Sequence, residues 1–386
     1  MKIEDAIKLE DSIRNIYITT NVTCNLRCIY CYEDKSSTEI FDVEKTKVSL
    51  LSQLQEKSGG RTIVNFHGGE PFLVYKQIKE LCEWIWEQET AEPYIFFATT
   101  NGTLVHGEIQ EWLLKNKHRF IAGLSLDGNR EMHNMNRSNS FDKIDIEFFA
   151  KTWPEQGVKM TVSPKSIEQL AAGVEFIHST GIHNILVNLA YMVNWNEPHF
   201  AKVYQRELKK LAEFYKKNPE LKRDTIFDVP FQLLVAPDAK KRKWCGAGTQ
   251  TKAYDVDGRE YPCHLFFESV CGKEKSEGWH DIDFSSPDVY ISKECAVCPL
   301  YPTCPTCYGA NYIERGNIGS RDMSLCKLEK IRILEVARFE YDRIMNSNDT
   351  DQINAEEASK RLNTLEALEK IEPILIEIEK ELEAAE

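Results

Sequence analysis

The chain of 386 residues lacks any uninterrupted apolar stretch near the roughly 20 residues that a membrane span requires. It also lacks an excess of positive charge, because its net charge of −13 disfavours non-specific binding to nucleic-acid phosphates. The opening residues MKIEDAIKLE do not show the basic-then-apolar pattern of a secretory signal. These absences predict a cytoplasmic protein that binds neither membranes nor nucleic acid.

The composition is that of a soluble globular protein, with 42% hydrophobic and 28% charged residues, and the length suits two domains. Its 12 cysteines are unevenly spread. They gather in 24–31 and in 245–326, and Cys82 stands alone in an apolar helical pattern that predicts a buried core thiol. In a reducing compartment, grouped cysteines predict thiolate ligands and not disulfides.

The first group, Cys24, Cys28 and Cys31, directly follows the apolar, strand-like stretch 16–20. A C-x₃-C-x₂-C triplet is one cysteine short of a fully ligated four-iron cluster, so the fourth iron is free to bind another molecule. Structural zinc is the alternative, but zinc usually takes four ligands from paired C-x₂-C motifs, and the nearest histidine, His67, lies far along the chain. The triplet therefore predicts an iron–sulfur reaction site at a strand end.

This spacing resembles the radical SAM superfamily, in which the unique iron binds the amino and carboxyl groups of S-adenosylmethionine (SAM). Tyr30 matches the aromatic residue that this superfamily places against the adenine, although a packed surface aromatic is the alternative. The segment His67-Gly68-Gly69-Glu70-Pro71 resembles the GGEP motif, which receives the SAM amino group. Two glycines would let the backbone approach a ligand, and the Glu70 carboxylate would accept from its ammonium.

Short apolar runs alternate with amphipathic stretches over the first 190 residues, which predicts successive parallel βαβ crossovers. The expected strands are 16–20, 62–66, 94–99, 120–126, 158–162 and 184–189. The expected helices are 43–55, 76–88, 108–114, 142–151, 167–179 and 198–215. The pattern fits a partial barrel or an open doubly wound sheet. The resemblance implies an α/β fold with a partial (β/α)6 TIM-like barrel and its site at the strand C-termini.

Polar residues follow two of the expected strands, in Thr99-Thr100-Asn101-Gly102-Thr103 and in Ser125-Leu126-Asp127-Gly128. Hydroxyl, amide and carboxylate groups suit ribose hydroxyls and a methionine carboxylate, although Asn-Gly and Asp-Gly are commonly turns. Thr100, Asn101, Ser125 and Asp127 are the predicted cofactor contacts. Arg137, in a segment that resembles peptide-modifying radical SAM enzymes, is predicted to contact a carboxylate or substrate, with a surface ion pair as the alternative.

The second cysteine group resembles the SPASM extension of radical SAM enzymes, which binds two auxiliary iron–sulfur clusters through interleaved ligands. Taken alone, its C-x₂-C pairs would also pass as a zinc knuckle. The resemblance assigns an outer cluster to Cys295, Cys298, Cys304 and Cys326, and an inner cluster to Cys245, Cys263 and Cys307. Counting makes Cys271 the candidate fourth inner ligand; as a free thiol it would leave an open iron. The last pair is C-x₂-C where the family commonly has C-x₃-C.

The predicted domains are a barrel in 1–223, a bridging segment in 224–243, a SPASM domain in 244–330 and C-terminal helices in 331–386. The cysteine-rich part has few long apolar runs, so metal is expected to substitute for a core. An apolar pattern of Leu328, Ile331, Leu334, Ala337, Tyr341 and Ile344 predicts a helix that packs back. The segment 353–385 is expected to be a docked amphipathic helix kinked at Pro373, or alternatively a partner groove. Its apolar stripe is Leu362, Leu365, Leu368, Ile374, Leu375 and Ile378.

The resemblance implies three [4Fe-4S] clusters, SAM, and a 5′-deoxyadenosyl radical that abstracts hydrogen from a peptide or protein, with ferredoxin or flavodoxin as electron donor. Sulfatase-maturating members carry an aspartate after the cysteine that matches Cys263. His264 stands there instead and is a candidate base or a packed residue. We therefore predict a maturase that forms a thioether or carbon–carbon crosslink in a ribosomally made peptide. Oxidation to formylglycine and a zinc-stabilised binding module are the alternatives. With the triplet starting at Cys24, leader binding is expected from another protein or the C-terminal region.

Overall fold

The computed structural model describes residues 13–35, 37–236, 239, 241–346 and 355–384. The opening segment MKIEDAIKLE and both ends of the predicted helix 353–385 lie outside these residues. Within the described ranges, no helix is both long enough and apolar enough to pass through a membrane.

Six parallel strands follow one another in chain order, as the sequence predicted. They are β1 (Ile13–Asn21), β2 (Arg61–Gly68), β3 (Tyr94–Thr100), β4 (Phe120–Leu124), β5 (Val158–Val162) and β6 (Ile185–Leu189). β1 to β4 pair in sequence, β5 pairs with β6, and a bridge from Ser125 to Lys159 joins the two groups. A doubly wound sheet would reverse its strand order at a switch point. The unbroken order is that of the predicted partial barrel.

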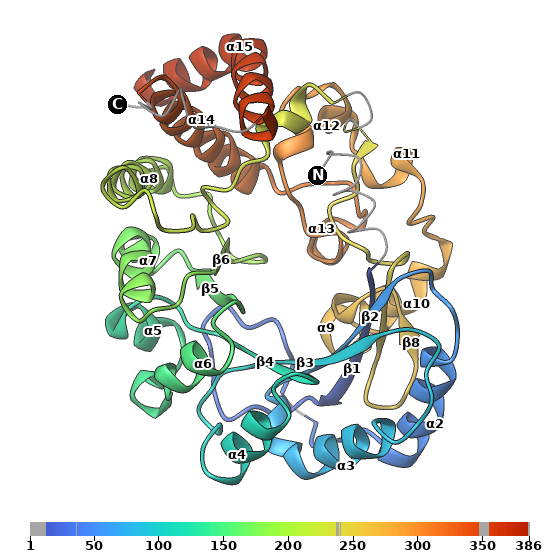
Figure 1. The fold of residues 1–386 in the computed structure, drawn as a ribbon. Coiled ribbons are helices and arrows are strands. Elements are labelled where there is room, and N and C mark those ends of the chain that lie inside the picture. The colour runs from blue at the N-terminus through green and yellow to red at the C-terminus, as the bar shows by residue number, and fades with distance from the viewer. Residues whose placement is uncertain (1–12, 36, 237–238, 240, 347–354, 385–386) are drawn as a thin grey trace.

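Helices cover the outer side of these strands, because alternate strand residues are apolar and must be buried (Figure 1). The helices are α2 (Val43–Leu54), α3 (Tyr75–Ile85), α4 (Glu108–Lys115), α5 (Arg130–Asn136), α6 (Ile146–Thr152), α7 (Leu170–Ser179) and α8 (His199–Lys217). Cys82 is fully buried among them, as expected. The sequence did not predict α5, which is short and polar. It begins because the Asn129 side chain accepts a hydrogen bond from Met132 N.

The cysteine-rich part continues the barrel sheet, which the sequence did not predict. β7 (Thr251–Tyr254) pairs in parallel with the free side of β1, and β8 (Glu260–Tyr261) pairs antiparallel with β7. The sheet order is therefore β4-β3-β2-β1-β7-β8. Backbone hydrogen bonds thus cross the predicted boundary at residue 243 and hold the second cysteine group against β1.

The rest of the cysteine-rich part consists of short helices around a small aromatic core. They are α9 (Glu268–Cys271), α10 (Lys273–Gly278), α11 (Pro287–Tyr290), α12 (Lys293–Val297) and α13 (Tyr308–Arg315). Their buried core includes Phe266, Phe284, Tyr308 and Ile318. The expectation that metal would take the place of a core was therefore incomplete, because aromatic packing also contributes here.

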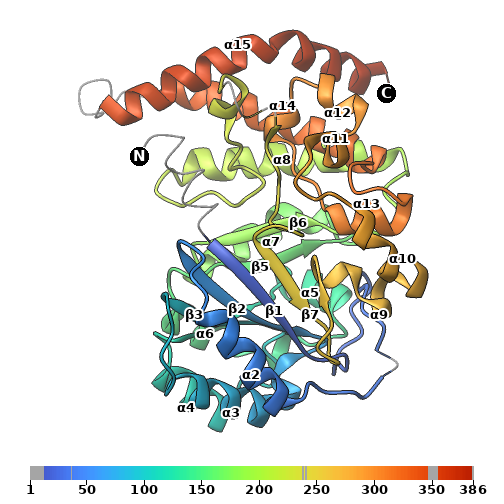
Figure 2. The same ribbon diagram turned by 90° about the vertical axis from the view of Figure 1, so that its right-hand side faces the viewer.

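Two long helices, α14 (Met323–Met345) and α15 (Ala355–Ala384), complete the chain, and α15 lies across α14 (Figure 2). On α14 the predicted apolar face is buried up to Ala337, whereas Tyr341 is 51% exposed. On α15 the docked helix is confirmed and runs through Pro373 without ending, but Leu362 is 66% exposed. The predicted Leu368 and Ile378 are buried, and Ala367 and Ile371, which were not predicted, join them on the buried face.

Arg332 of α14 joins three parts of the chain. Its guanidinium, almost fully buried, donates to Ile226 O at 2.9 Å, to Thr303 O at 3.2 Å and to the Glu329 carboxylate at 2.8 Å. We expect Arg332→Met to lower the free energy of unfolding by about 3 kcal/mol, because it leaves a half-buried carboxylate and two carbonyls unpaired. Urea titration of both proteins measures this loss.

The control is Arg343→Met on the same helix, whose side chain is 36% exposed and pairs with Glu340. Glu340 is buried but also pairs with Arg223, so the loss of the more exposed Arg343 should cost at most about 1 kcal/mol. Equal losses in the two variants would contradict the bridging role of Arg332.

Candidate functional site

The cysteine triplet lies in the loop directly after β1, at the C-terminal end of the barrel strands. All three thiols are free, and Cys31 is exposed. Burial raises the pKa of Cys24 and of Cys28, and the nearby Cys31 thiolate raises both further. The three thiols therefore face a common space, and soft thiolate ligands fit an iron–sulfur cluster.

The Gly68-Gly69 pair contacts the chain that leads into this loop. Gly69 N donates to Asn21 O at 3.1 Å and Glu70 N donates to Thr23 O at 2.9 Å. A Cβ on Gly69 would lie 2.0 Å from Thr23 O. The glycine motif predicts a close approach of backbone to a ligand, which stays a prediction. In the structure the backbone before Cys24 lies against the glycines, so the glycines position the cysteine loop.

The Glu70 carboxylate is buried and already engaged by protein donors. It accepts from Thr100 Oγ1 at 2.8 Å, from Asn101 N at 2.8 Å and from Phe72 N at 3.2 Å. Burial raises its pKa, while these hydrogen bonds lower it. Pro71 begins the 3-10 helix η1 (Pro71–Val74). The predicted motif therefore ties the end of β2 to the end of β3.

Asn101 continues this contact to the cysteine loop. Its side-chain amide donates to Asn25 Oδ1 at 2.9 Å, and Asn25 donates in turn to Thr103 Oγ1 at 2.7 Å. Ser125, also predicted, is buried at the end of β4, where its N–H donates to Thr100 O. The predicted polar residues of three strand ends thus form one continuous layer beneath the cysteines.

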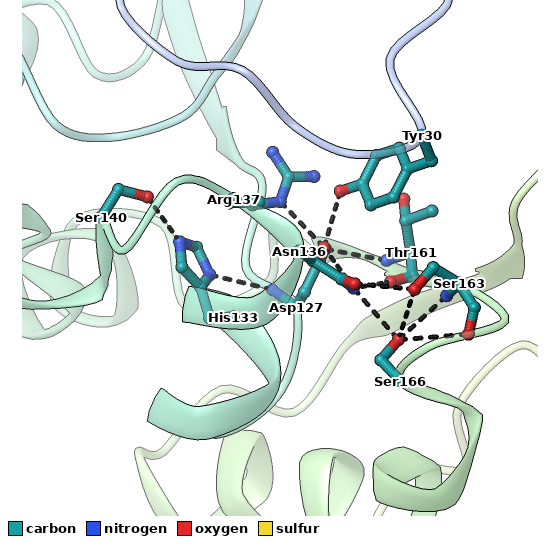
Figure 3. A network of polar contacts seen from close by, with 9 residues as sticks. All are labelled: Tyr30, Asp127, His133, Asn136, Arg137, Ser140, Thr161, Ser163 and Ser166. Carbon is teal, nitrogen blue, oxygen red and sulfur yellow. Dashed lines mark hydrogen bonds and ion pairs between the residues drawn. The ribbon is translucent and has the colours of Figure 1, made fainter.

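Asp127 is the centre of a buried polar network (Figure 3). Its Oδ2 accepts from Tyr30 OH at 2.6 Å and from Asn136 Nδ2 at 3.1 Å, and lies 3.0 Å from Arg137 Nε. Its Oδ1 accepts from Thr161 N at 2.9 Å. Both oxygens are occupied, so Asp127 joins the cysteine loop to β5 and α5.

The contacts in this network distinguish between the alternative roles considered for Arg137 and Tyr30. The Arg137 side chain is only 9% exposed, so the surface ion pair considered for it is wrong. Its guanidinium carbon lies 5.5 Å from the Tyr30 ring centroid. Tyr30 packs on Arg137 and Asp127 and is no simple surface aromatic. Its predicted contact with adenine and the predicted carboxylate contact of Arg137 remain predictions.

His264 brings the cysteine-rich part to the same end of the barrel. Its ring centroid lies 4.2 Å from that of His67, 5.8 Å from that of Tyr32 and 5.7 Å from that of Tyr17. His67 Nε2 also lies 3.0 Å from Glu33 Oε1. Burial holds the pKa of His264 well below its usual value, and no described residue forms a hydrogen bond with its Nδ1. Sequence reasoning missed this cluster, because its members come from four separate segments.

Electrostatic interactions link the remaining cysteines in two groups, and their assignment to an inner and an outer cluster stays a prediction. Thiolates of Cys307, Cys245 and Cys271 all raise the pKa of Cys263, after burial. In the other set, Cys298 and Cys295 raise the pKa of Cys326, which in turn raises that of Cys304. The Cys271 thiol is partly buried and donates to Phe266 O at 3.4 Å.

Arg321 adds a positive charge to the outer set, where its Nη1 lies 2.7 Å from Cys304 Sγ. Within the described residues, no three His, Cys, Asp or Glu side chains are arranged to hold a single metal ion. Zinc binds sulfur at about 2.3 Å and needs its ligands that close together, whereas a four-iron cluster separates its cysteines further.

Comparison with known proteins identifies the class of enzyme to which the chain belongs. Residues 18–206 match the model of the radical SAM superfamily, so this part of the chain is a radical SAM domain and the protein is a radical SAM enzyme. The superfamily implies a [4Fe-4S] cluster and SAM. A zinc-stabilised binding module is therefore no longer a suitable description.

Two individual relatives are similar to most of the chain. The chain is 22% identical over 319 residues to a cysteine-type anaerobic sulfatase-maturating enzyme of Clostridium perfringens, covering 73% of this chain and 84% of the relative. It is 25% identical over 319 residues to the antilisterial bacteriocin subtilosin biosynthesis protein AlbA of Bacillus subtilis, covering 77% and 68%.

Solved structures share the fold. A tagged anSMEcpe with bound AdoMet has a TM-score of 0.67 and 19% identity, covering 91% of this chain and 98% of that one. SuiB of Streptococcus suis bound to S-adenosylmethionine has a TM-score of 0.55 and 16% identity, covering 83% and 79%.

The glycine contact gives a testable consequence. We expect Gly69→Ala to displace the chain before Cys24, because backbone oxygen cannot yield to a Cβ as a flexible side chain would. The variant should bind less iron after anaerobic reconstitution and should be roughly 2 kcal/mol or more less stable. The matched control is Gly157→Ala, where a Cβ would meet no atom closer than 3.3 Å. Normal iron content in Gly69→Ala would argue against the positioning role.

His133 makes stability depend on pH. Burial lowers its pKa to about 4, and it contacts Asp127 N at 3.2 Å and Ser140 Oγ at 3.0 Å. The unfolded chain takes up this proton near pH 6.5, before the folded protein does. Its contribution is therefore present above pH 6.5 and is lost as the pH falls toward 4.

We expect His133→Asn to remove about 2 kcal/mol of the difference in unfolding free energy between pH 7 and pH 5, measured with urea. Replacing the exposed His106 by Asn should leave that difference intact. If the His133 variant keeps the same pH dependence as the parent protein, the buried neutral imidazole is not its source.

Proposed function

We propose that this radical SAM enzyme is a peptide maturase that forms a thioether or carbon–carbon crosslink in a ribosomally made peptide. The SAM-binding cluster and SAM would supply the 5′-deoxyadenosyl radical that abstracts hydrogen from the peptide. The observation that carries the proposal is the meeting, at one end of the barrel, of the cysteine triplet with His264 and the inner cysteine set. A substrate side chain at this place would lie between the SAM-binding cluster and the inner auxiliary cluster.

The residues that would hold the SAM-binding cluster are Cys24, Cys28 and Cys31. Tyr30 and Arg137 flank them, so the Tyr30 ring is suited to adenine and the Arg137 guanidinium to the SAM carboxylate. The Asp127 carboxylate would act through both, because it holds them in place. Glu70 would act in the same indirect way.

Gly68, Gly69, Pro71, Thr100, Asn101 and Ser125 would complete the cofactor site, chiefly by fixing the layer under the cysteine loop. Their observed hydrogen bonds all join strand ends to one another or to that loop. A rigid floor of this kind keeps a bound cofactor in one orientation.

Two auxiliary [4Fe-4S] clusters would bring the total to three. Cys295, Cys298, Cys304 and Cys326 would hold the outer one, with Arg321 beside Cys304 offsetting its negative charge. Cys245, Cys263 and Cys307 would hold the inner one. Cys271, which lies near enough to Cys263 to raise its pKa, is the proposed fourth inner ligand, and an open iron with Cys271 as a free thiol is the alternative. Ferredoxin or flavodoxin would supply the electrons.

A peptide substrate is supported by the proteins that share this fold. One of them is described as native anSMEcpe with bound AdoMet and Cp18Cys peptide, and another as SuiB bound to precursor peptide SuiA. Both have TM-scores above 0.5, at 0.65 and 0.54.

Crosslinking is favoured over oxidation to formylglycine by His264. The resemblance places an aspartate there in sulfatase-maturating enzymes, whereas this chain has an imidazole packed between His67 and Tyr32. Formylglycine formation is the second candidate, and the similarity to sulfatase-maturating enzymes over 73% of the chain favours it. In either reaction His264 would be the group that receives a proton from the substrate.

Intact mass of the product tests the proposal. The enzyme is co-expressed anaerobically with any short peptide encoded beside its gene, and the purified peptide is weighed. We expect a loss of two hydrogens together with a thiol or aromatic side chain that no longer reacts. An aldehyde-reactive product would favour formylglycine instead. Active SAM cleavage with an unchanged peptide would contradict crosslinking of that peptide.

Iron analysis tests the cluster assignment. Three clusters predict about twelve irons per chain after reconstitution. Cys271→Ala should alter the spectrum of one cluster only, whereas Cys82→Ala, at a buried cysteine outside both groups, should leave iron content unchanged. Four irons per chain would contradict the auxiliary clusters.

A further inference from the structure

Lys159 lies on β5 with its side chain on the interior side of the barrel. Its strand neighbours Val158, Met160 and Val162 are buried on the opposite, helix-covered side, at 3%, 0% and 0% exposure. Side chains alternate along a strand, so Lys159 must point the other way. A lysine in the middle of an otherwise apolar parallel strand is unusual, because both faces of such sheets are normally buried.

The surroundings of Lys159 are charged, yet they leave its ammonium unpaired. Among the described residues, Lys159 Nζ has no hydrogen-bond or ion-pair partner. The Lys159 side chain is exposed to solvent, although the surrounding protein, and then the Arg137 charge, lower its pKa. Asp127, a carboxylate close enough to raise the pKa of Lys159, is already bonded to Tyr30, Asn136, Thr161 and Arg137. An ammonium without an anion of its own can form a charge-assisted hydrogen bond, so this position favours an arriving carboxylate.

The neighbouring strand adds a wall that suits a peptide. Leu186, the register partner of Lys159 on β6, is 42% exposed on the same side, and Asn188 follows it two residues later. Asn188 also lines a cavity of about 240 Å³ that reaches Tyr191 and Cys304. The Lys159 ammonium suits a substrate carboxylate, Leu186 suits an apolar side chain, and the Asn188 amide suits the peptide backbone.

We propose that Lys159 determines substrate specificity by binding a carboxylate of the peptide substrate. This inference rests on the proposed peptide maturase function. The Lys159 ammonium influences His264 and is influenced by Cys307, both from the cysteine-rich part, whereas Arg137 packs on Tyr30 of the SAM-side loop. The two cations thus divide the site. Arg137 serves the cofactor side, and Lys159 serves a carboxylate from an acidic side chain or from the peptide C-terminus.

Equilibrium binding tests the proposal without requiring turnover. The probes are fluorescein-labelled, cysteine-containing peptides that differ only in Asp, Asn or Lys beside the cysteine, each with a free or an amidated C-terminus. Fluorescence anisotropy is measured anaerobically on reconstituted enzyme with SAM. We expect the parent enzyme to bind one carboxylate form about tenfold more tightly than its neutral counterpart. The Asp–Asn pair and the acid–amide pair tell the two sources of carboxylate apart.

Charge reversal is the decisive variant. Lys159→Glu should lose the preference for the carboxylate and bind the Lys peptide more tightly, whereas Lys159→Gln should lose all preference. The control is Lys202→Glu, an exposed lysine on the outer face of α8, which changes net charge equally and should behave as the parent enzyme.

Two results would overturn the proposal. One is a carboxylate preference that Lys159→Glu retains. The other is unchanged peptide binding together with a shifted reduction potential of an auxiliary cluster, which would assign Lys159 to the charge of the cluster near Cys307. A parent enzyme that binds the acidic peptide but never modifies any peptide would contradict the maturase function and leave the Lys159 site intact.

Discussion

The buried carboxylate of Asp127 is the interaction on which the rest of the site depends. It has no exposed surface and satisfies its charge with Arg137, Tyr30, Asn136 and the Thr161 amide. A buried charge is tolerated only when it is fully paired, so each of these partners is held in place by the others. The cysteine loop is therefore attached to β4, β5 and α5 before any cofactor arrives, which preorganises the three thiols.

A second constraint brings the cysteine-rich part to the same place. β7 adds to the edge of β1, and His264 inserts between the cysteine loop and β2. Because strand pairing fixes the register, the inner cysteine set is held at the barrel end where the triplet lies. Two groups of thiols more than 200 residues apart in the sequence thus lie near the same residue, because Cys31, Cys263 and Cys307 all raise the pKa of Tyr32, after burial and Glu33. Radical chemistry needs an enclosed space, since water and oxygen must be excluded.

The strand and helix pattern was predictable because apolar periodicity is a local property. The expected strand 158–162 matches β5 residue for residue. Errors arose where the outcome depends on distant partners. Arg137 was left open as a surface residue because its partners come from separate elements, and the contacts of the glycine pair with Asn21 and Thr23 were missed because those residues could not be placed. Tyr341 and Leu362 have helical spacing, but neighbouring helices leave them exposed.

The sequence by itself determined the chemistry that this protein can hold. The cysteine spacings, the GGEP segment and the order of strands are local patterns, and ligand type and loop length follow from them directly. Only the tertiary structure decided which groups share a site. The partners of Asp127, the stacking of His264 on His67 and the isolated position of Lys159 arise from contacts between distant segments. Such contacts are set by burial and packing over the whole chain, which no local pattern encodes.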